Sequence, residues 1–375
     1  MPEIADIFRK YGPVYIERYG NRMPEFHREA IYDISNCRTE AMGSHVYVCE
    51  KCHKKVFHYH SCRNRHCPKC QGDRANKWRE KQMKRLLPTV TYHLVTFTIP
   101  EEFRQIARSN QKLIYGILFR TSAAALKKLA ADPRFIGGQI GMTGILHTWT
   151  RALLYHPHVH FIVPGGGYDE ENEKWHFSNK KFLVPVKALS KIFRAKFRDE
   201  FRKTPFSKEI SANVWGKDWV VHSKPVGSGK HALEYLSAYV YRVAITDKRI
   251  VRIQDDEVTF RYRESETGIL KTQKLHSLEF IRRFLWHVLP PGFVKIRHFG
   301  FLSPVKTAVF QKLFQFLTGM LILFGMLPKG FVFPGCEIKS ESIDQNHLRC
   351  KHCGGRLVLI EINKTGRGPP VPCLC

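Results

Sequence analysis

The sequence predicts an α+β protein in which helices flank a central antiparallel sheet and a small cysteine-rich module lies at the N-terminal end. Three observations lead to this prediction. Six cysteines lie within 34 residues of one another, between Cys37 and Cys70. Residues 89–99 and 158–164 are rich in β-branched and aromatic side chains and end at proline or glycine, as strands do. Residues 101–131 lack proline and place apolar side chains at helical spacing.

Length and charge narrow the possible classes of protein. The 375 residues, 43% of them hydrophobic, can build a real core and two or three domains, which excludes a disordered tail. The 61 Lys and Arg against 33 Asp and Glu leave a net charge of +28, and self-repulsion at such a charge opposes compact folding. The first 50 residues have a net charge of −2, whereas residues 51–90 have +10. We therefore expect a polyanionic partner, and the excess of positive charge begins inside the cysteine-rich segment.

A membrane is not the expected partner. The N-terminus has no apolar segment typical of a signal peptide. The most apolar stretch, Leu313–Leu327, has 15 residues, short of the ~20 that span a bilayer, and is expected to be a buried helix. The expected location is the cytoplasm of a bacterial or archaeal cell, near the nucleoid. Cysteines stay reduced there, and clustered pairs more often bind metal than form disulfides.

The cysteine cluster predicts zinc binding. Cys49-x-x-Cys52 and Cys67-x-x-Cys70 are paired knuckles separated by fourteen residues, and two such turns can close a four-sulfur site. A second site of two sulfurs and two nitrogens is expected from the remaining ligands, Cys37, Cys62, His45 and His66. Exchange of ligands between the two sites stays open, and His53, His58 and His60 compete for them. The basic residues among the ligands are candidates for DNA phosphate contacts: Arg63, Arg65, Lys69 and Arg74.

A further pair of cysteines lies near the other end of the sequence. Cys350-x-x-Cys353 is followed by two glycines and resembles half of a zinc ribbon. Cys373-x-Cys375 is the pair that would close it. A second zinc knuckle built from these four cysteines is expected as an alternative to reduced, unliganded thiols.

The middle of the chain is expected to hold the main domain. After the strand at 89–99 and the helices at 101–131, residues 141–150 are expected to form a short loop, and residues 158–164 a second strand. Two strands with a short connection suggest an antiparallel pair. The expected domains are residues 1–88 with the zinc-binding module, residues 89–330 with the main domain, and residues 331–375 as a C-terminal tail.

The strand at 158–164 carries the most informative motif. His158 and His160 are two residues apart, so both imidazoles point to one face of a strand while Val159 points to the other. Two imidazoles on one face are half of a site for a divalent metal. A third ligand should come from the neighbouring strand, a role that His147, eleven residues upstream, fits; His156 in the loop is the alternative. Taken alone, His-x-His is a common and often accidental pattern.

A tyrosine pair follows later in the chain. Tyr235 and Tyr239 are four residues apart, so that on a helix the two hydroxyls lie side by side on one face. Aromatic residues at this spacing are more often part of a core than catalytic. The pair gains meaning only in combination with the histidines and the cysteine module.

In that combination the chain resembles the IS91 family of transposases, which are HUH endonucleases with two tyrosines. The segments that carry the resemblance are SCRNRHCPKCQ (61–71), LHTWTRALLYHPHVHFIVPGGG (146–167), EYLSAYVYRVAI (234–245), VTFRYR (258–263) and EFIRRFLWHVLPPGFVKIRHFGFL (279–302). The resemblance covers about residues 30–325. Two local departures are Tyr241, where the family has His, and Asp247, where it has Asn.

The resemblance implies an HUH-type nuclease core and a reaction. Tyr235 or Tyr239 would attack a phosphate of single-stranded or hairpin element ends, form a 5′-phosphotyrosine, and rejoin strands into target DNA in rolling-circle-like transposition. His158, His160 and His147 would hold Mg²⁺ or Mn²⁺, with Zn²⁺ confined to the cysteine-rich module. A rolling-circle replication initiator and a non-catalytic zinc-finger DNA-binding protein are the alternatives. The oligomeric state stays open.

Overall fold

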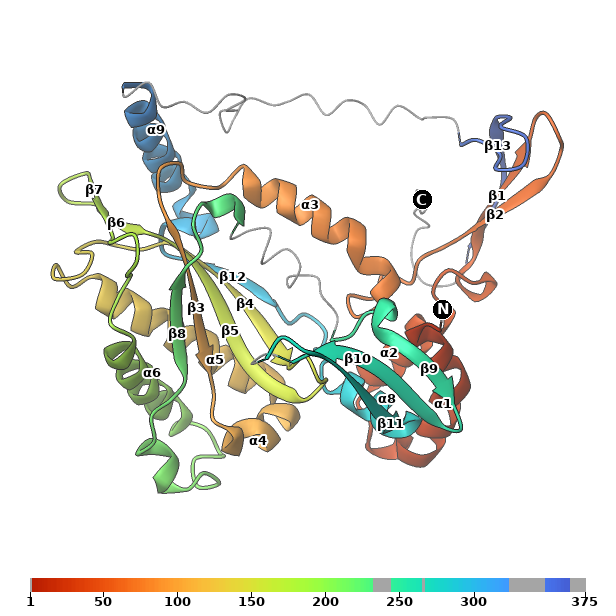
Figure 1. Cartoon of the computed structure of the whole chain (residues 1–375), viewed down its shortest axis with the longest axis horizontal. Coiled ribbons are helices and arrows are strands. Elements are labelled where there is room, and N and C mark those ends of the chain that lie inside the picture. Colours follow the sequence, from red (N-terminus) through yellow and green to blue (C-terminus); the bar gives the residue numbers. More distant parts are fainter. Residues whose placement is uncertain (1, 232–243, 265–266, 324–347, 365–375) are drawn as a thin grey trace. The chain divides into compact units, whose positions relative to one another are not determined.

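The computed structural model describes residues 2–231, 244–264, 267–323 and 348–364, with the backbone alone at 71–75. The described chain combines helices with antiparallel sheets, which confirms the predicted α+β class (Figure 1). None of the helices in these ranges is both long and apolar enough to cross a membrane.

The chain divides into two compact units that alternate along the sequence. The first unit consists of residues 1–74, 241–288 and 332–375, and the second of residues 75–240 and 289–331. This division differs from the three consecutive segments expected from the sequence. The difference arises because residues far apart in the chain pack together, as the ring centroids of Phe8 and Phe284 do at 5.1 Å in the first unit.

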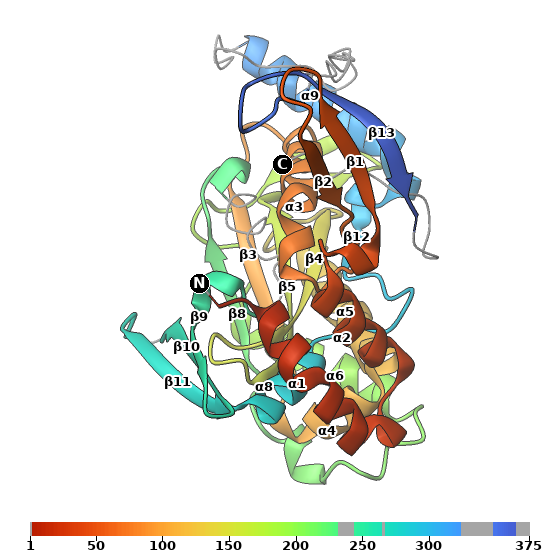
Figure 2. The same ribbon diagram turned by 90° about the vertical axis from the view of Figure 1, so that its right-hand side faces the viewer.

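The first unit holds two helices from the N-terminus, one later helix and two three-stranded sheets. Its elements are α1 (Ile4–Tyr19), α2 (Glu25–Asn36), β1 (Ser44–Cys49), β2 (Lys55–Tyr59), β9 (Ile250–Gln254), β10 (Glu257–Arg263), β11 (Leu270–His276), α8 (Ser277–Leu285) and β13 (Leu357–Asn363), with single-turn 3₁₀ helices at Gly20–Arg22, Glu40–Met42, Pro68–Cys70 and Asp247–Arg249. The strand orders are β11-β10-β9 and β13-β1-β2, all antiparallel. Figure 2 shows β13 beside β1, although some 300 residues separate the two strands in the chain.

Asp247, one of the departures from the family pattern, has a structural role in this unit. Its carboxylate accepts a hydrogen bond of 2.8 Å from the backbone N–H of Ile4. The first N–H groups of a helix have no partner within the helix, and a carboxylate there also meets the positive end of the helix dipole. Asp247 therefore stabilises the start of α1.

The second unit is built on a five-stranded antiparallel sheet in the order β12-β4-β5-β3-β8. Its elements are α3 (Gln71–Met83), which the division between units crosses, β3 (Tyr92–Thr98), α4 (Arg104–Ser109), α5 (Gln111–Ala130), β4 (Met142–Trp149), β5 (Tyr155–Pro164), β6 (Gly166–Asp169), β7 (Lys174–Phe177), α6 (Val186–Phe201), β8 (Val221–Pro225), β12 (Ile296–Phe299) and α9 (Thr307–Leu323), with 3₁₀ helices at Glu101–Phe103, Ala212–Trp215, Gly300–Leu302 and Pro304–Lys306. The hairpin β6-β7 stands outside the main sheet.

Helices α5 and α6 cover one face of this sheet (Figure 1). Phe97 of β3 packs edge to face on Phe161 of β5 and on Phe193 of α6, with ring centroids 5.8 Å and 5.0 Å apart. All three side chains are fully buried. Because side chains alternate along a strand, this packing sends the neighbouring residues Thr96 and His160 to the opposite face.

One element differs from its prediction. Residues 142–149 form the strand β4 rather than a loop, and β4 pairs with β5 along its length. Ile145 and Leu146 are buried on opposite faces of β4, as a central strand requires. The apolar stretch 313–327 is a helix as far as Leu323, with Leu313 and Leu317 buried, and its remainder lies outside the described residues.

Candidate metal centres

Three histidines gather on the face of the five-stranded sheet that lies opposite helices α5 and α6. His147 of β4 stands directly opposite His158 of β5, and His160 follows two residues later on the same face. Their ring centroids lie 4.6 to 5.4 Å apart. One ligand nitrogen from each lies within 4.8 Å of the others, a spacing that suits a single metal ion. The strand register thus brings together the three residues expected from the sequence.

Hydrogen bonds hold two of these rings in place. The Nδ1 of His158 lies 2.6 Å from the carbonyl oxygen of His156, so Nδ1–H donates and Nε2 carries the lone pair. The Nδ1 of His160 lies 2.7 Å from the Thr96 hydroxyl, which stands opposite it on β3. Partners of this kind orient histidines that bind metals. Sequence reasoning missed Thr96, because only the β3–β5 register places it beside His160.

The electrostatic setting keeps these imidazoles neutral. Burial lowers the pKa of His158 well below its ordinary value, and the nearby His160 adds to the effect. Burial, together with the positive charge of Lys224, lowers the pKa of His160 to about 4. Both rings are therefore unprotonated at neutral pH, the form in which imidazole binds a metal.

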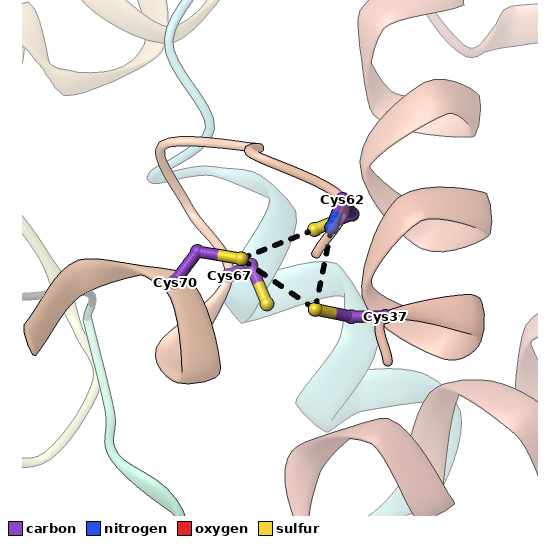
Figure 3. A group of neighbouring side chains, drawn as sticks. All are labelled: Cys37, Cys62, Cys67 and Cys70. Atoms are coloured by element: carbon purple, nitrogen blue, oxygen red, sulfur yellow. Dashed lines mark hydrogen bonds between the residues drawn. The ribbon is translucent and has the colours of Figure 1, made fainter. Parts of the chain in front are cut away.

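A first group of sulfurs lies in the other unit, at the start of the cysteine-rich segment. Cys37, Cys62, Cys67 and Cys70 converge from the end of α2 and from the loop that precedes α3 (Figure 3). The sulfur of Cys70 lies 3.5 Å from that of Cys37 and 3.7 Å from that of Cys62. A tetrahedral zinc site with Zn–S bonds of ~2.3 Å has sulfur–sulfur edges of ~3.8 Å. The four sulfurs are spaced as such a site requires.

A second group joins both ends of the described chain. Cys49 lies 3.4 Å from Cys353, and Cys52 lies 3.7 Å from Cys350, measured between sulfurs. All four ligand atoms lie within 4.8 Å of one another. The two groups of sulfurs therefore divide the eight cysteines of the described residues four and four.

This grouping differs from the one expected from spacing alone, which joined Cys49 and Cys52 to Cys67 and Cys70. The β1–β2 hairpin explains the difference. Cys49 is at the turn end of β1, whereas Ser44 pairs with Tyr59, just before Cys62, at the other end. Five residues of strand separate the two ends by roughly 16 Å, too far for one metal ion. The expected partners Cys373 and Cys375 lie outside the described residues.

The two histidines expected as zinc ligands lie elsewhere. His45 is buried in β1, and its Nδ1 lies 2.8 Å from the Nε2 of His60. His66 donates its backbone N–H to the side chain of Asn64. Neither belongs to any ligand group among the described residues. The sequence predicted His45 and His66 as the partners of Cys37 and Cys62, and the structure places Cys67 and Cys70 there instead.

The four basic residues proposed for DNA contact differ in their surroundings. Arg63 is exposed, and burial lowers the pKa of Arg65. Lys69 forms an ion pair of 2.6 Å with Glu3. The side chain of Arg74 lies outside the described residues, as do both proposed nucleophiles, Tyr235 and Tyr239. Of the three whose side chains the structure describes, Arg63 has the exposure that a phosphate contact needs.

Comparison with known proteins identifies the family. Residues 7–99 match the family described as "Transposase zinc-binding domain", and residues 141–308 match the family described as "Putative transposase". A protein of Sinorhizobium fredii (strain NBRC 101917 / NGR234), described as "Putative transposase y4qJ", is 38% identical over 395 aligned residues, covering 98% of this chain and 97% of the relative. The chain belongs to the IS91 family of transposases. The "Transposase for insertion sequence element IS801" of Pseudomonas savastanoi pv. phaseolicola is 27% identical over 352 residues, covering 88% of this chain and 82% of that protein. No solved structure matches the chain.

Membership of the IS91 family confirms the resemblance read from the sequence. The transposase match spans all three histidines and the two proposed tyrosines. The zinc-binding match spans the whole of the first sulfur group and the Cys49–Cys52 knuckle, and it ends long before Cys350. The chain is thus an enzyme of a DNA-transposing family and carries a zinc-binding domain.

Proposed function

We propose that the chain cuts and rejoins single strands of DNA at the ends of its element, by the tyrosine-dependent chemistry of HUH endonucleases. The observation that carries this proposal is the His147, His158 and His160 group on one face of the five-stranded sheet. Three imidazoles, of which His158 and His160 are neutral and held in orientation by hydrogen bonds, form a metal-binding half-shell, and the remaining positions can take phosphate oxygens and water. Family membership supports the same chemistry.

The histidines of the sheet would hold and orient a metal ion. His158 and His160 would present Nε2 to the ion, since His156 and Thr96 engage their Nδ1 atoms. A bound Mg²⁺ or Mn²⁺ would polarise the scissile phosphate and offset the charge that develops on it. Neutral ligands leave the charge of the ion intact for this purpose. Imidazole by itself favours zinc, so the preference for Mg²⁺ or Mn²⁺ rests on the resemblance.

Tyr235 and Tyr239 would supply the nucleophiles. The tyrosine oxygen attacks phosphorus, the bond from phosphorus to the 3′ oxygen breaks, and the released 3′ oxygen takes up a proton. The 5′-phosphotyrosine keeps a phosphodiester, so that a 3′-hydroxyl can reverse the step and join strands without another energy source. A pair of tyrosines could hold one DNA end while the other attacks a second. Rolling-circle-like transposition is the process that such a sequence of steps would serve.

A covalent adduct tests the proposal. Purified protein is incubated with labelled single-stranded element ends and Mn²⁺, and adducts that survive denaturant are counted. We expect an adduct that is lost in Tyr235→Phe/Tyr239→Phe. The matched control is Tyr19→Phe/Tyr32→Phe, two exposed tyrosines of α1 and α2, which should keep it.

The outcome also separates the alternatives. Absence of any adduct across end sequences from both termini would leave only a zinc-dependent DNA-binding protein. An adduct that forms on a replication origin and not on element ends would indicate a replication initiator. An adduct retained by Tyr235→Phe/Tyr239→Phe would refute the assignment of the nucleophiles.

A further inference from the structure

The second sulfur group is built from two turns of the same design. Each is a C-x-x-C segment whose first cysteine N–H donates to the carbonyl five residues on: Cys49 to Lys54 at 3.1 Å, and Cys350 to Gly355 at 2.8 Å. In each, the residue after the second cysteine has a positive φ, 57° at His53 and 70° at Gly354. Both turns are therefore knuckles of the kind that hold structural zinc.

Backbone N–H groups point at the first sulfur of each knuckle. Those of Cys52 and Lys51 donate to the sulfur of Cys49. Those of His352 and Cys353 donate to the sulfur of Cys350. The same two positions of each turn thus donate to the sulfur, and they stabilise it as the thiolate that a metal binds.

Strand pairing brings the two knuckles face to face. Cys49 pairs with Leu357 where β1 meets β13, and the N–H of Glu50 donates to the carbonyl of Arg356 at 3.0 Å. Cys49 and Cys350 are buried with Tyr47 and Leu357 in a small cluster. Such a small core stabilises the pairing of β1 with β13 only weakly. A cross-link between the two knuckles would add the stability that the core lacks.

We propose that Cys49, Cys52, Cys350 and Cys353 bind a second, structural zinc ion that joins the two ends of the chain in one split zinc ribbon. The four thiols bind as thiolates and release their protons, with no change of oxidation state. A closed set of four sulfurs leaves no position for substrate, so this zinc has no catalytic task. Cys350 and Cys353 lie outside both stretches that match known families. Cys373 and Cys375 are not needed to complete the four-sulfur site.

Zinc content tests the proposal. The full chain is purified in the presence of a reductant and without chelator, and zinc is measured by mass spectrometry of the metal. We expect about two zinc ions per chain, falling to about one in Cys350→Ser/Cys353→Ser. The matched control Cys373→Ser/Cys375→Ser should keep about two. Retention of both ions in the first variant, or loss of one in the control, would overturn the proposal.

Cysteine alkylation of the chain without substitutions tests the proposal even if the variant does not fold. The zinc-loaded protein is alkylated with iodoacetamide before and after treatment with a zinc chelator, and each cysteine is scored by peptide mass spectrometry. Cys49, Cys52, Cys350 and Cys353 should be protected together and become reactive together. Cys373 and Cys375 should react in both samples. Alkylation of Cys350 and Cys353 in the loaded protein, with Cys49 and Cys52 protected, would rule out the split site.

Discussion

The histidine group and the two cysteine groups hold their geometry by different means. The histidines stand on neighbouring central strands of a five-stranded sheet, whose other face is packed with fully buried phenylalanines. The cysteines stand on turns and strand ends, and the sheet that carries half of them buries only a small cluster. The comparison teaches that the sheet can form its site before any metal arrives, whereas the cysteine module needs the metal in order to hold its shape.

Removal of zinc should have the largest effect of the changes considered. It should unfold the cysteine module and leave the five-stranded sheet folded. Structural zinc contributes ~10–16 kcal/mol to the folding of small zinc modules. Treatment with a strong chelator should therefore abolish hydrogen-exchange protection in β1, β2 and β13 and leave β3, β4 and β5 protected. Added zinc should restore the lost protection. Unchanged protection of β1 without zinc would show that the cysteine module folds by packing alone.

The histidine pair should show the opposite behaviour. His158→Ala/His160→Ala should lower adduct formation by at least about a thousandfold, because a metal ion contributes several kcal/mol to such a reaction. The melting temperature should change little, since the phenylalanine packing on the other face of the sheet is unchanged. His222→Ala is the control, an exposed histidine opposite Thr96 on β8. Collapse of the fold in the double variant would contradict a site that the sheet forms in advance.

Packing under the sheet should account for the stability of the second unit. Phe193 is fully buried against Phe97, so Phe193→Ala should cost ~3–5 kcal/mol of unfolding free energy in a denaturant titration. Phe182→Ala, at a residue 45% exposed, should cost less than ~1 kcal/mol. Equal costs for the two variants would mean that the phenylalanine core is not what supports the histidines.

Thr96 tests how finely the sheet orients its ligands. Thr96→Val keeps the branched shape but removes the hydroxyl that meets Nδ1 of His160. We expect a fall of ~10- to 100-fold in Mn²⁺ affinity, as for other groups that orient metal ligands. Thr96→Ser should restore most of it. A Mn²⁺ titration followed by electron paramagnetic resonance measures the affinity directly, and equal affinity in Thr96→Val would remove the positioning role.

The smallest effect should come from the basic rim of the split ribbon. A cavity of about 500 Å³ there is lined by Lys54, Lys351 and other basic and aromatic residues. Lys54→Ala and Lys351→Ala should each weaken DNA binding severalfold and each reduce the slope of log affinity against log salt by ~1. Lys274→Ala, an exposed lysine paired with Glu257, is the control. Unchanged slopes would place the DNA path elsewhere on the chain.

The spacing of residues in the sequence correctly predicted features that depend on neighbouring residues alone. His158 and His160 share a face because any strand alternates its side chains, and the helices at 104–130 follow from apolar spacing. Residues 142–149 were predicted wrongly, because Gly144 weighs against a strand until the neighbouring strands that bury Ile145 are known.

Long-range pairing explains what spacing could not predict. Cys52 and Cys67 are close in the chain, yet the β1–β2 hairpin carries their knuckles to opposite ends. The sulfur nearest to that of Cys52 in the second group is that of Cys350, and the sequence signal for this grouping was the C-x-x-C pattern that both segments share. The division into units has the same origin, since α8 returns to pack on α1.

The split ribbon also has a consequence for synthesis of the chain. Cys52 and Cys350 are 298 positions apart, so at 5–20 residues per second the N-terminal knuckle leaves the ribosome roughly 15–60 s before its partner. During that interval the nearest thiols along the chain outside the knuckle are those of Cys62 and Cys37. A zinc ion caught between these neighbours has to exchange ligands once β13 arrives. Completion of translation, and not the first encounter with metal, therefore sets the moment at which the correct pairs of cysteines can form.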